Sequence, residues 1–161
     1  MKFGPVSPTN LELVRTKSAA PGYYFAPDCQ LMIVRTPVGN RILPMRGSGQ
    51  FVEVAAVEST TLLRLKDFDV EVSFGEPVRY NPDPTWGAGH LVIAGSGLVS
   101  LAAFVRPSPQ GEFERMSFDI KSCGYVIADD YAHERMWFRE WELIAVRDGV
   151  RSVLAGSLPI T

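Results

Sequence analysis

The chain has 161 residues, a formal net charge of −2, 46% hydrophobic and 21% charged residues. This length is typical of one domain with a sizeable core, and the composition excludes wholesale disorder. A slightly acidic chain also lacks the basic excess that nucleic-acid binding usually needs. We therefore expect a soluble globular protein without a nucleic-acid partner.

The cysteines and the first residues bear on the cellular setting. Cys29 and Cys123 are the only two cysteines, so one disulfide is the most that the chain can form. Residues 1–5 lack the apolar core of a signal peptide, which favours an intracellular or virion-associated protein. The longest uncharged stretch, residues 91–105, is shorter than the ~20 apolar residues of a membrane-spanning helix. No membrane span is expected.

Residues 1–30 contain four prolines around one short apolar piece, residues 11–14. Proline fixes φ and removes a backbone donor, so this part is predicted to be an extended arm or an edge segment. The arm either packs on the single β domain of residues 31–161 or swaps to a second copy. Tyr23 and Tyr24 follow Gly22 in this arm, and they either pin it to the core or contact a ligand or partner.

Short strands with turn signals are predicted along the first half of the domain. Residues 31–34 and 41–43 suggest a hairpin with a loop of four or five residues, containing Gly39 and Asn40. Residues 67–74 alternate apolar and polar side chains, as in a strand with one face in water. Residues 59–65 fit either a short helix or a strand that breaks near Lys66.

Residues 76–90 read as a long loop, and loops of this length are often functional. Trp86 lies in this loop with Asp83 and His90. An exposed indole ring that stacks on a sugar, assisted by polar side chains, would suit carbohydrate or small-ligand binding. The alternative is that Trp86 folds back as a lid over the core.

The second half is predicted to contain mostly strands as well. Residues 91–105 fit two buried strands joined at Gly95–Gly97, and residues 116–120 begin another strand that continues through residues 125–126. Residues 130–142 are either a helix or, from Met136 onward, a strand.

Asp148 and Gly149 between apolar runs predict a type I′ hairpin, in which both turn residues have positive φ. This turn would place Ile144 opposite Val153 and Leu143 opposite Leu154. The first strand of the hairpin is apolar on both sides, so it is predicted to lie centrally in a packed sheet. Together these patterns predict a mainly β fold, an antiparallel β-sandwich or jelly-roll-like barrel, with one short helix at most, at 59–65 or 130–140.

Motifs for common chemistry are absent from the sequence. Ser96 lies between Gly95 and Gly97, which does not match the Gly-x-Ser-x-Gly pattern of hydrolases, and no phosphate-binding glycine motif occurs. Asp129, Asp130, His133 and Glu134 place one imidazole and three carboxylates within six residues. This group is either a metal site of an enzyme or a solvated acidic turn. No cofactor is expected.

The sequence thus favours a non-catalytic protein-interaction or assembly module, of the kind seen among viral or phage structural and accessory proteins. Its predicted contacts are Tyr23, Tyr24 and Trp86, supported by Asp83 and His90. The alternatives are a carbohydrate- or small-ligand-binding β-sandwich that uses the Trp86 loop, and a metal-dependent enzyme that uses residues 129–134.

Overall fold

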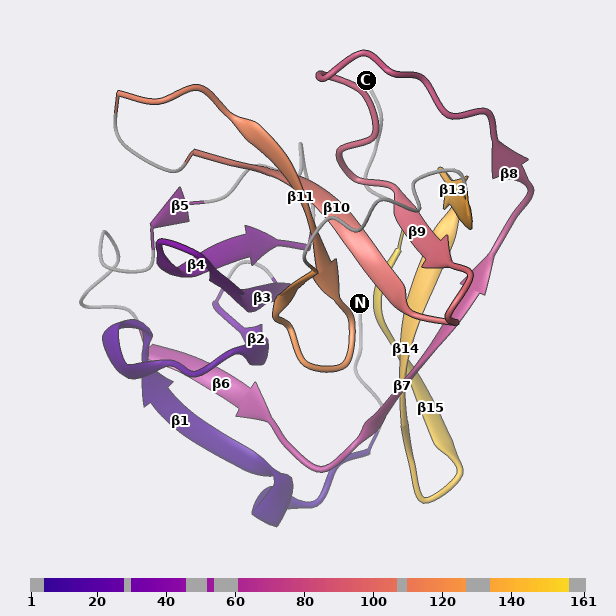
Figure 1. Ribbon diagram of the computed structural model, residues 1–161. Coiled ribbons are helices and arrows are strands. Elements are labelled where there is room, and N and C mark those ends of the chain that lie inside the picture. The colour runs from indigo at the N-terminus through magenta and orange to yellow at the C-terminus, as the bar shows by residue number, and fades with distance from the viewer. Residues whose placement is uncertain are drawn as a thin grey trace.

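A computed structural model describes residues 5–27, 30–45, 52–53, 61–106, 110–126 and 134–156. Its strands form three antiparallel sheets (Figure 1). The first sheet has the order β1 (Leu11–Arg15), β6 (Thr61–Leu65), β2 (Gly22–Phe25), β3 (Gln30–Thr36), β4 (Gly39–Pro44), β5 (Val52–Glu53). The second has the order β12 (Tyr125–Val126), β11 (Glu114–Asp119), β10 (Val99–Val105), β9 (Leu91–Ala94), β13 (Arg135–Phe138), β8 (Pro77–Val78). The third is β15 (Val150–Gly156), β14 (Trp141–Arg147), β7 (Asp69–Phe74).

The predicted class, mainly antiparallel β, is confirmed. Each sheet has two end strands, so no sheet closes into a barrel. The part of the chain that the structure describes contains no α-helix, and so no helix that could cross a membrane. It includes the short 3₁₀ turns η1 (Pro8–Asn10) and η2 (Thr16–Ser18). Thr61–Leu65 is a strand rather than the alternative short helix, and Arg135–Phe138 is a strand as preferred. Residues 130–133 lie outside the described ranges.

One hydrophobic core joins the three sheets. Met32 comes from the first sheet, Phe118 from the second and Leu143 from the third, and all three side chains are fully buried in one cluster. Residues 67–74 alternate apolar and polar side chains, and the apolar side chains of Phe68, Val70 and Val72 pack against this core. The three sheets therefore share one large buried cluster, and two smaller clusters of buried residues lie apart from it.

The Asp148–Gly149 hairpin forms as predicted, with φ of 47° at Asp148 and 77° at Gly149. β14 lies centrally between β15 and β7, and Ile144 pairs with Val153. Leu143, however, pairs with Ala155 instead of Leu154, because the register shifts between Leu143 and Ile144. An extra residue in one strand of an antiparallel pair produces such a shift.

Two other turns differ from the expectation. The β3–β4 hairpin has a loop of two residues, since Thr36 pairs with Gly39, and the Thr36 hydroxyl closes it by donating to the Gly39 carbonyl at 2.6 Å. The strand of residues 116–120 does not continue through Tyr125. The chain reverses at Cys123, where φ is 58°, and β12 returns antiparallel to β11.

The first 30 residues contribute two strands to the first sheet. β1 forms the edge of the sheet, and β2 lies inside it between β6 and β3. A parallel bridge between Arg35 and Gly124, with a 2.9 Å bond from the Arg35 N–H to the Cys123 carbonyl, connects the first sheet to the second. The proposed division into an arm and a domain at residue 30 stays a prediction.

Candidate functional site

The Trp86 loop is shaped by short-range hydrogen bonds. The Asn81 amide oxygen accepts from the Asp83 N–H, and the Asp83 carboxylate accepts from both the N–H and the hydroxyl of Thr85, all within 3.0 Å. Side chains that bond the backbone two residues ahead favour turns over regular structure. The bonds from Thr85 lower the pKa of the exposed Asp83 carboxyl. Asp83 therefore holds the loop in shape while remaining in solvent.

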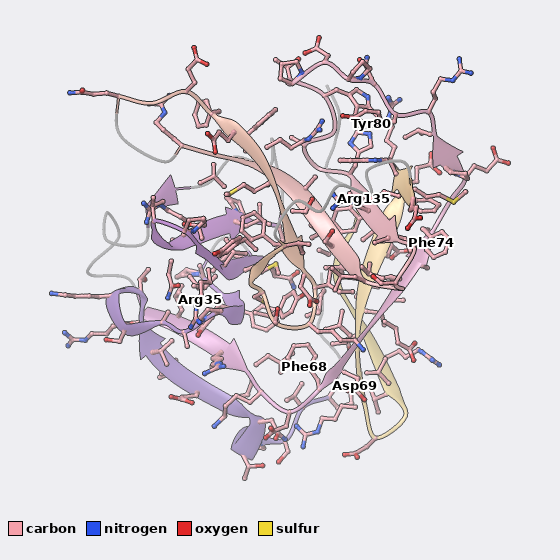
Figure 2. All side chains as sticks on the ribbon, viewed as in Figure 1. Arg35, Phe68, Asp69, Phe74, Tyr80 and Arg135 are labelled. Carbon is pink, nitrogen blue, oxygen red and sulfur yellow. The ribbon has the colours of Figure 1, made fainter. Side chains whose placement is uncertain are left out.

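Trp86 belongs to a cluster of rings, which we call the aromatic cluster. Its ring centroid lies 5.5 Å from that of Tyr80, 4.9 Å from that of His90 and 5.1 Å from that of Trp137. Arg115 closes the cluster, with its guanidinium 5.0 Å from the centroid of Trp137 and its Nη1 donating to the Trp86 carbonyl at 2.6 Å. Tyr80, labelled in Figure 2, is an exposed member of the cluster. Trp86 is partly exposed, and its use in sugar binding stays a prediction.

His90 is a buried member of the aromatic cluster, as Trp137 is, with 3% of its surface exposed. Neither ring nitrogen has a well-formed hydrogen bond among the described residues. Burial lowers the pKa of His90 below its usual range, and this outweighs the nearby Ala88 carbonyl, which favours the charged form. The imidazole is therefore neutral at neutral pH, and it lines the interior side of the loop.

Tyr23 and Tyr24 point to opposite faces of β2. Tyr23 is 5% exposed in the shared core and donates to the Ile120 carbonyl at 2.6 Å, whereas Tyr24 is 1% exposed in a separate cluster and donates to the Ala20 carbonyl at 2.6 Å. Both hydroxyls are thus satisfied within the chain. The structure brings Trp86 and His90 together and places Asp83 in the same loop, while the two tyrosines lie on β2 in the first sheet.

The remaining candidates for reactive or metal-binding chemistry are the cysteines and the proposed metal ligands. Cys123 is buried and unpaired, and burial raises the pKa of its thiol to about 12, so it is protonated and a poor nucleophile. Within the described ranges no group of three or more His, Cys, Asp and Glu side chains could hold a metal ion. Asp129, Asp130, His133 and Cys29 lie outside those ranges, so the metal-site hypothesis stays a prediction.

The first sheet carries an exposed leucine at the end of a row of apolar side chains. Leu13, in the edge strand β1, is 72% exposed, the highest value among the exposed large apolar side chains of the described residues. It lies opposite Leu63 on β6, which in turn lies opposite Phe25 on β2. These three residues form an apolar row across three strands that ends at the open edge. The sequence showed only a short apolar piece at 11–14, because exposure cannot be read from a strand of five residues.

No protein-family model, curated protein or solved structure matches this chain.

Proposed function

We propose that this protein is an assembly module that self-associates by pairing its edge strand β1 with β1 of a second copy. The observation that carries the proposal is Leu13, a leucine 72% exposed in the middle of a strand that pairs on one side only among the described residues. An open strand edge offers unpaired N–H and C=O groups to another chain, and exposed edges that carry apolar residues favour such pairing. In Figure 1, β1 lies at one end of the first sheet, and β5 lies at the other end.

The sequence of β1 suits antiparallel pairing with itself. A two-fold axis beside Leu13 would place Leu13 opposite its own copy, Glu12 opposite Val14 and Leu11 opposite Arg15. No like charges face each other in this register. Moving the axis to Glu12 would set two glutamates opposite each other, and cross-strand pairs of like charge are destabilising.

The apolar row supports the same register. Leu13, Leu63 and Phe25 would continue across the axis into the equivalent row of the second copy and so form one apolar band over six strands. The 3₁₀ turns at the two ends of β1, Pro8–Asn10 and Thr16–Ser18, limit the paired segment to about the five residues between them.

The test is the oligomeric state, measured by light scattering behind size exclusion over a range of concentrations. We expect a dimer for the unmodified chain. Leu13→Lys should weaken it by at least about tenfold, because it removes apolar contacts in both copies and sets like charges opposite each other. Val38→Lys is the matched control, since Val38 is also exposed but lies in the β3–β4 turn; it should leave the dimer unchanged.

A chain that is monomeric at all concentrations, or an oligomer that is equally stable with Leu13→Lys, would contradict the proposal. Deleting residues 1–20 would be a poorer test. That deletion removes β1 and uncovers β6, whose Leu62 and Leu65 are buried. Loss of assembly would then be confounded with loss of folding.

A further inference from the structure

Residues 79–86, which we call the lid, are attached to the rest of the protein at few points. The backbone of the lid bonds to itself, as in the 2.9 Å bond from the Trp86 N–H to the Asp83 carbonyl. Among the described residues, the hydrogen bonds that reach the lid from another element all come from Arg115 on β11, to the Trp86 carbonyl at 2.6 Å and to the Tyr80 hydroxyl at 3.3 Å. A segment with so few attachments opens more easily than the fold as a whole. Figure 1 shows this part of the chain leaving β8 and returning to β9.

The chain on either side of the lid is fixed to the second sheet. Before the lid, Val78 pairs with Trp137. After it, the Gly89 N–H donates to the Ala102 carbonyl at 2.7 Å. Gly87 lies between the lid and this second attachment with a φ of 94°, and glycine passes between positive and negative φ at little cost. The lid is therefore able to move outward while both of its ends stay in place.

The closed lid covers a buried imidazole and an apolar face of the second sheet. The Trp86 ring packs against His90 and against the small cluster of buried residues Val92, Ala102 and Trp137. The two nitrogens of His90 are buried without a well-formed hydrogen bond. Outward movement of Trp86 therefore brings water to the imidazole and to these apolar side chains.

The charged groups around His90 disfavour a second positive charge. Burial is the main cause that lowers the pKa of His90, and two guanidinium groups lower it further, those of Arg139 between β13 and β14 and of Arg115 on β11. The charged side chains of the lid itself, Arg79 and Asp83, are exposed, and the Asp83 carboxylate accepts hydrogen bonds within the lid. An imidazolium under the closed lid would thus be buried beside two cations.

Two features favour the charged imidazole, and neither holds the lid closed. The carbonyls of Ala88 and Gly87 raise the pKa of His90, but they belong to a turn that the His90 N–H closes by donating to the Gly87 carbonyl at 3.0 Å. This turn stays beside the imidazole when the lid moves. The Trp86 ring attracts a nearby cation, but this attraction is smaller than the cost of burying an ion without a hydrogen bond.

We propose that the lid is a pH-sensitive device, in which protonation of His90 releases Trp86 from the second sheet and exposes Val92, Ala102 and Trp137. The open state accepts a proton that the closed state refuses, so acid shifts the equilibrium toward opening. The lid lies on the second sheet of a single chain, and the proposal therefore does not rest on self-association at β1.

The experiment follows the full chain by relaxation-dispersion NMR of its backbone amides between pH 7.5 and 5.5. We expect the population of the open lid to rise on acidification by at most about tenfold per pH unit below 6.5, the ordinary pKa of histidine, because one proton is taken up on opening. The amides of β3 in the first sheet are the internal control and should show no such rise.

Three variants sharpen the test. His90→Phe keeps a ring beneath Trp86 and removes the titrating group, so motion of the lid should no longer depend on pH. Arg139→Gln removes one cation near His90 without touching the lid, and it should make the pH dependence shallower. Arg35→Gln removes the same charge from an exposed position on β3 and should change nothing.

Three results would overturn the proposal. They are a lid without exchange at any pH, exchange that does not depend on pH, and a rise on acidification that is equally large in His90→Phe. A rise in β3 as large as in the lid would also contradict it, since that result indicates opening of the whole fold.

Discussion

Some polar side chains of this protein are deeply buried, and His90 is the clearest case. Its ring packs against Trp86 and has no well-formed hydrogen bond among the described residues. The sequence singled out His90 as a loop residue that supports a binding site. Only the packing of Trp86 and Trp137 shows that the imidazole is an interior group.

The buried His90 makes stability depend on pH. Its pKa in the folded chain is lowered from the ordinary 6.5, so below about pH 6.5 the unfolded chain takes up a proton that the folded chain refuses. The stability that the neutral imidazole contributes is present above this pH and is lost as the pH falls. We expect the free energy of unfolding to decrease on acidification, by at most about 1.4 kcal/mol per pH unit from this group.

Urea unfolding at several pH values between 7.5 and 5 measures this dependence. His90→Phe removes the titrating group and keeps a ring beside Trp86, so its pH dependence should be shallower, whatever its absolute stability. Identical pH profiles for the two proteins would show that His90 does not titrate differently on folding.

At the scale of elements, turns set the register of the strands. Asp148 and Gly149 both have positive φ, as a type I′ turn requires, and the sequence predicted this turn correctly. It did not predict the bulge at Leu154 in β15, five residues after Gly149, because a bulge depends on how β14 and β15 fit together in the sheet. The turn residues nevertheless account for the pairing of Ile144 with Val153.

Gly149→Ala tests the turn directly. No atom lies within 4 Å of the Cβ that alanine would add, so any cost comes from its backbone at φ of 77°. We expect a loss of about 1 kcal/mol in the free energy of unfolding, measured by urea titration. Asp148→Gly is the matched control and should be neutral or slightly stabilising. A loss as large with Asp148→Gly as with Gly149→Ala would argue against a backbone origin.

At the scale of the whole molecule, three open sheets share one core. Leu143 lies fully buried on the central strand of the third sheet, in the same cluster as Met32 and Phe118. Since small domains with one continuous core usually unfold cooperatively, damage at Leu143 should destabilise all three sheets together.

Leu143→Ala should therefore cost about 2–5 kcal/mol, the usual range for a buried leucine. The loss should be the same by far-ultraviolet circular dichroism, which reports on all strands, and by tryptophan fluorescence. The fluorescence comes from Trp137 in the second sheet, Trp86 in the loop before β9 and Trp141 in the third sheet. Separate transitions for the two signals would show that the sheets unfold independently. An exposed counterpart, Val150→Ala at the start of β15, should change stability little.

The sequence by itself determined the local features of this protein. Alternation in residues 67–74, the Asp-Gly turn and the glycines at 95–97 predict strands and turns that the structure contains, because period-2 patterning and positive φ are properties of neighbouring residues. The tertiary structure decided the burial and the contacts of residues that lie far apart in the chain. It buried Tyr23 and Tyr24 and left Leu13 exposed in the end strand β1. These outcomes depend on which strands lie at the ends of a sheet and on where the pairing of two strands stops. Both are decided by pairing between strands that are distant in the sequence.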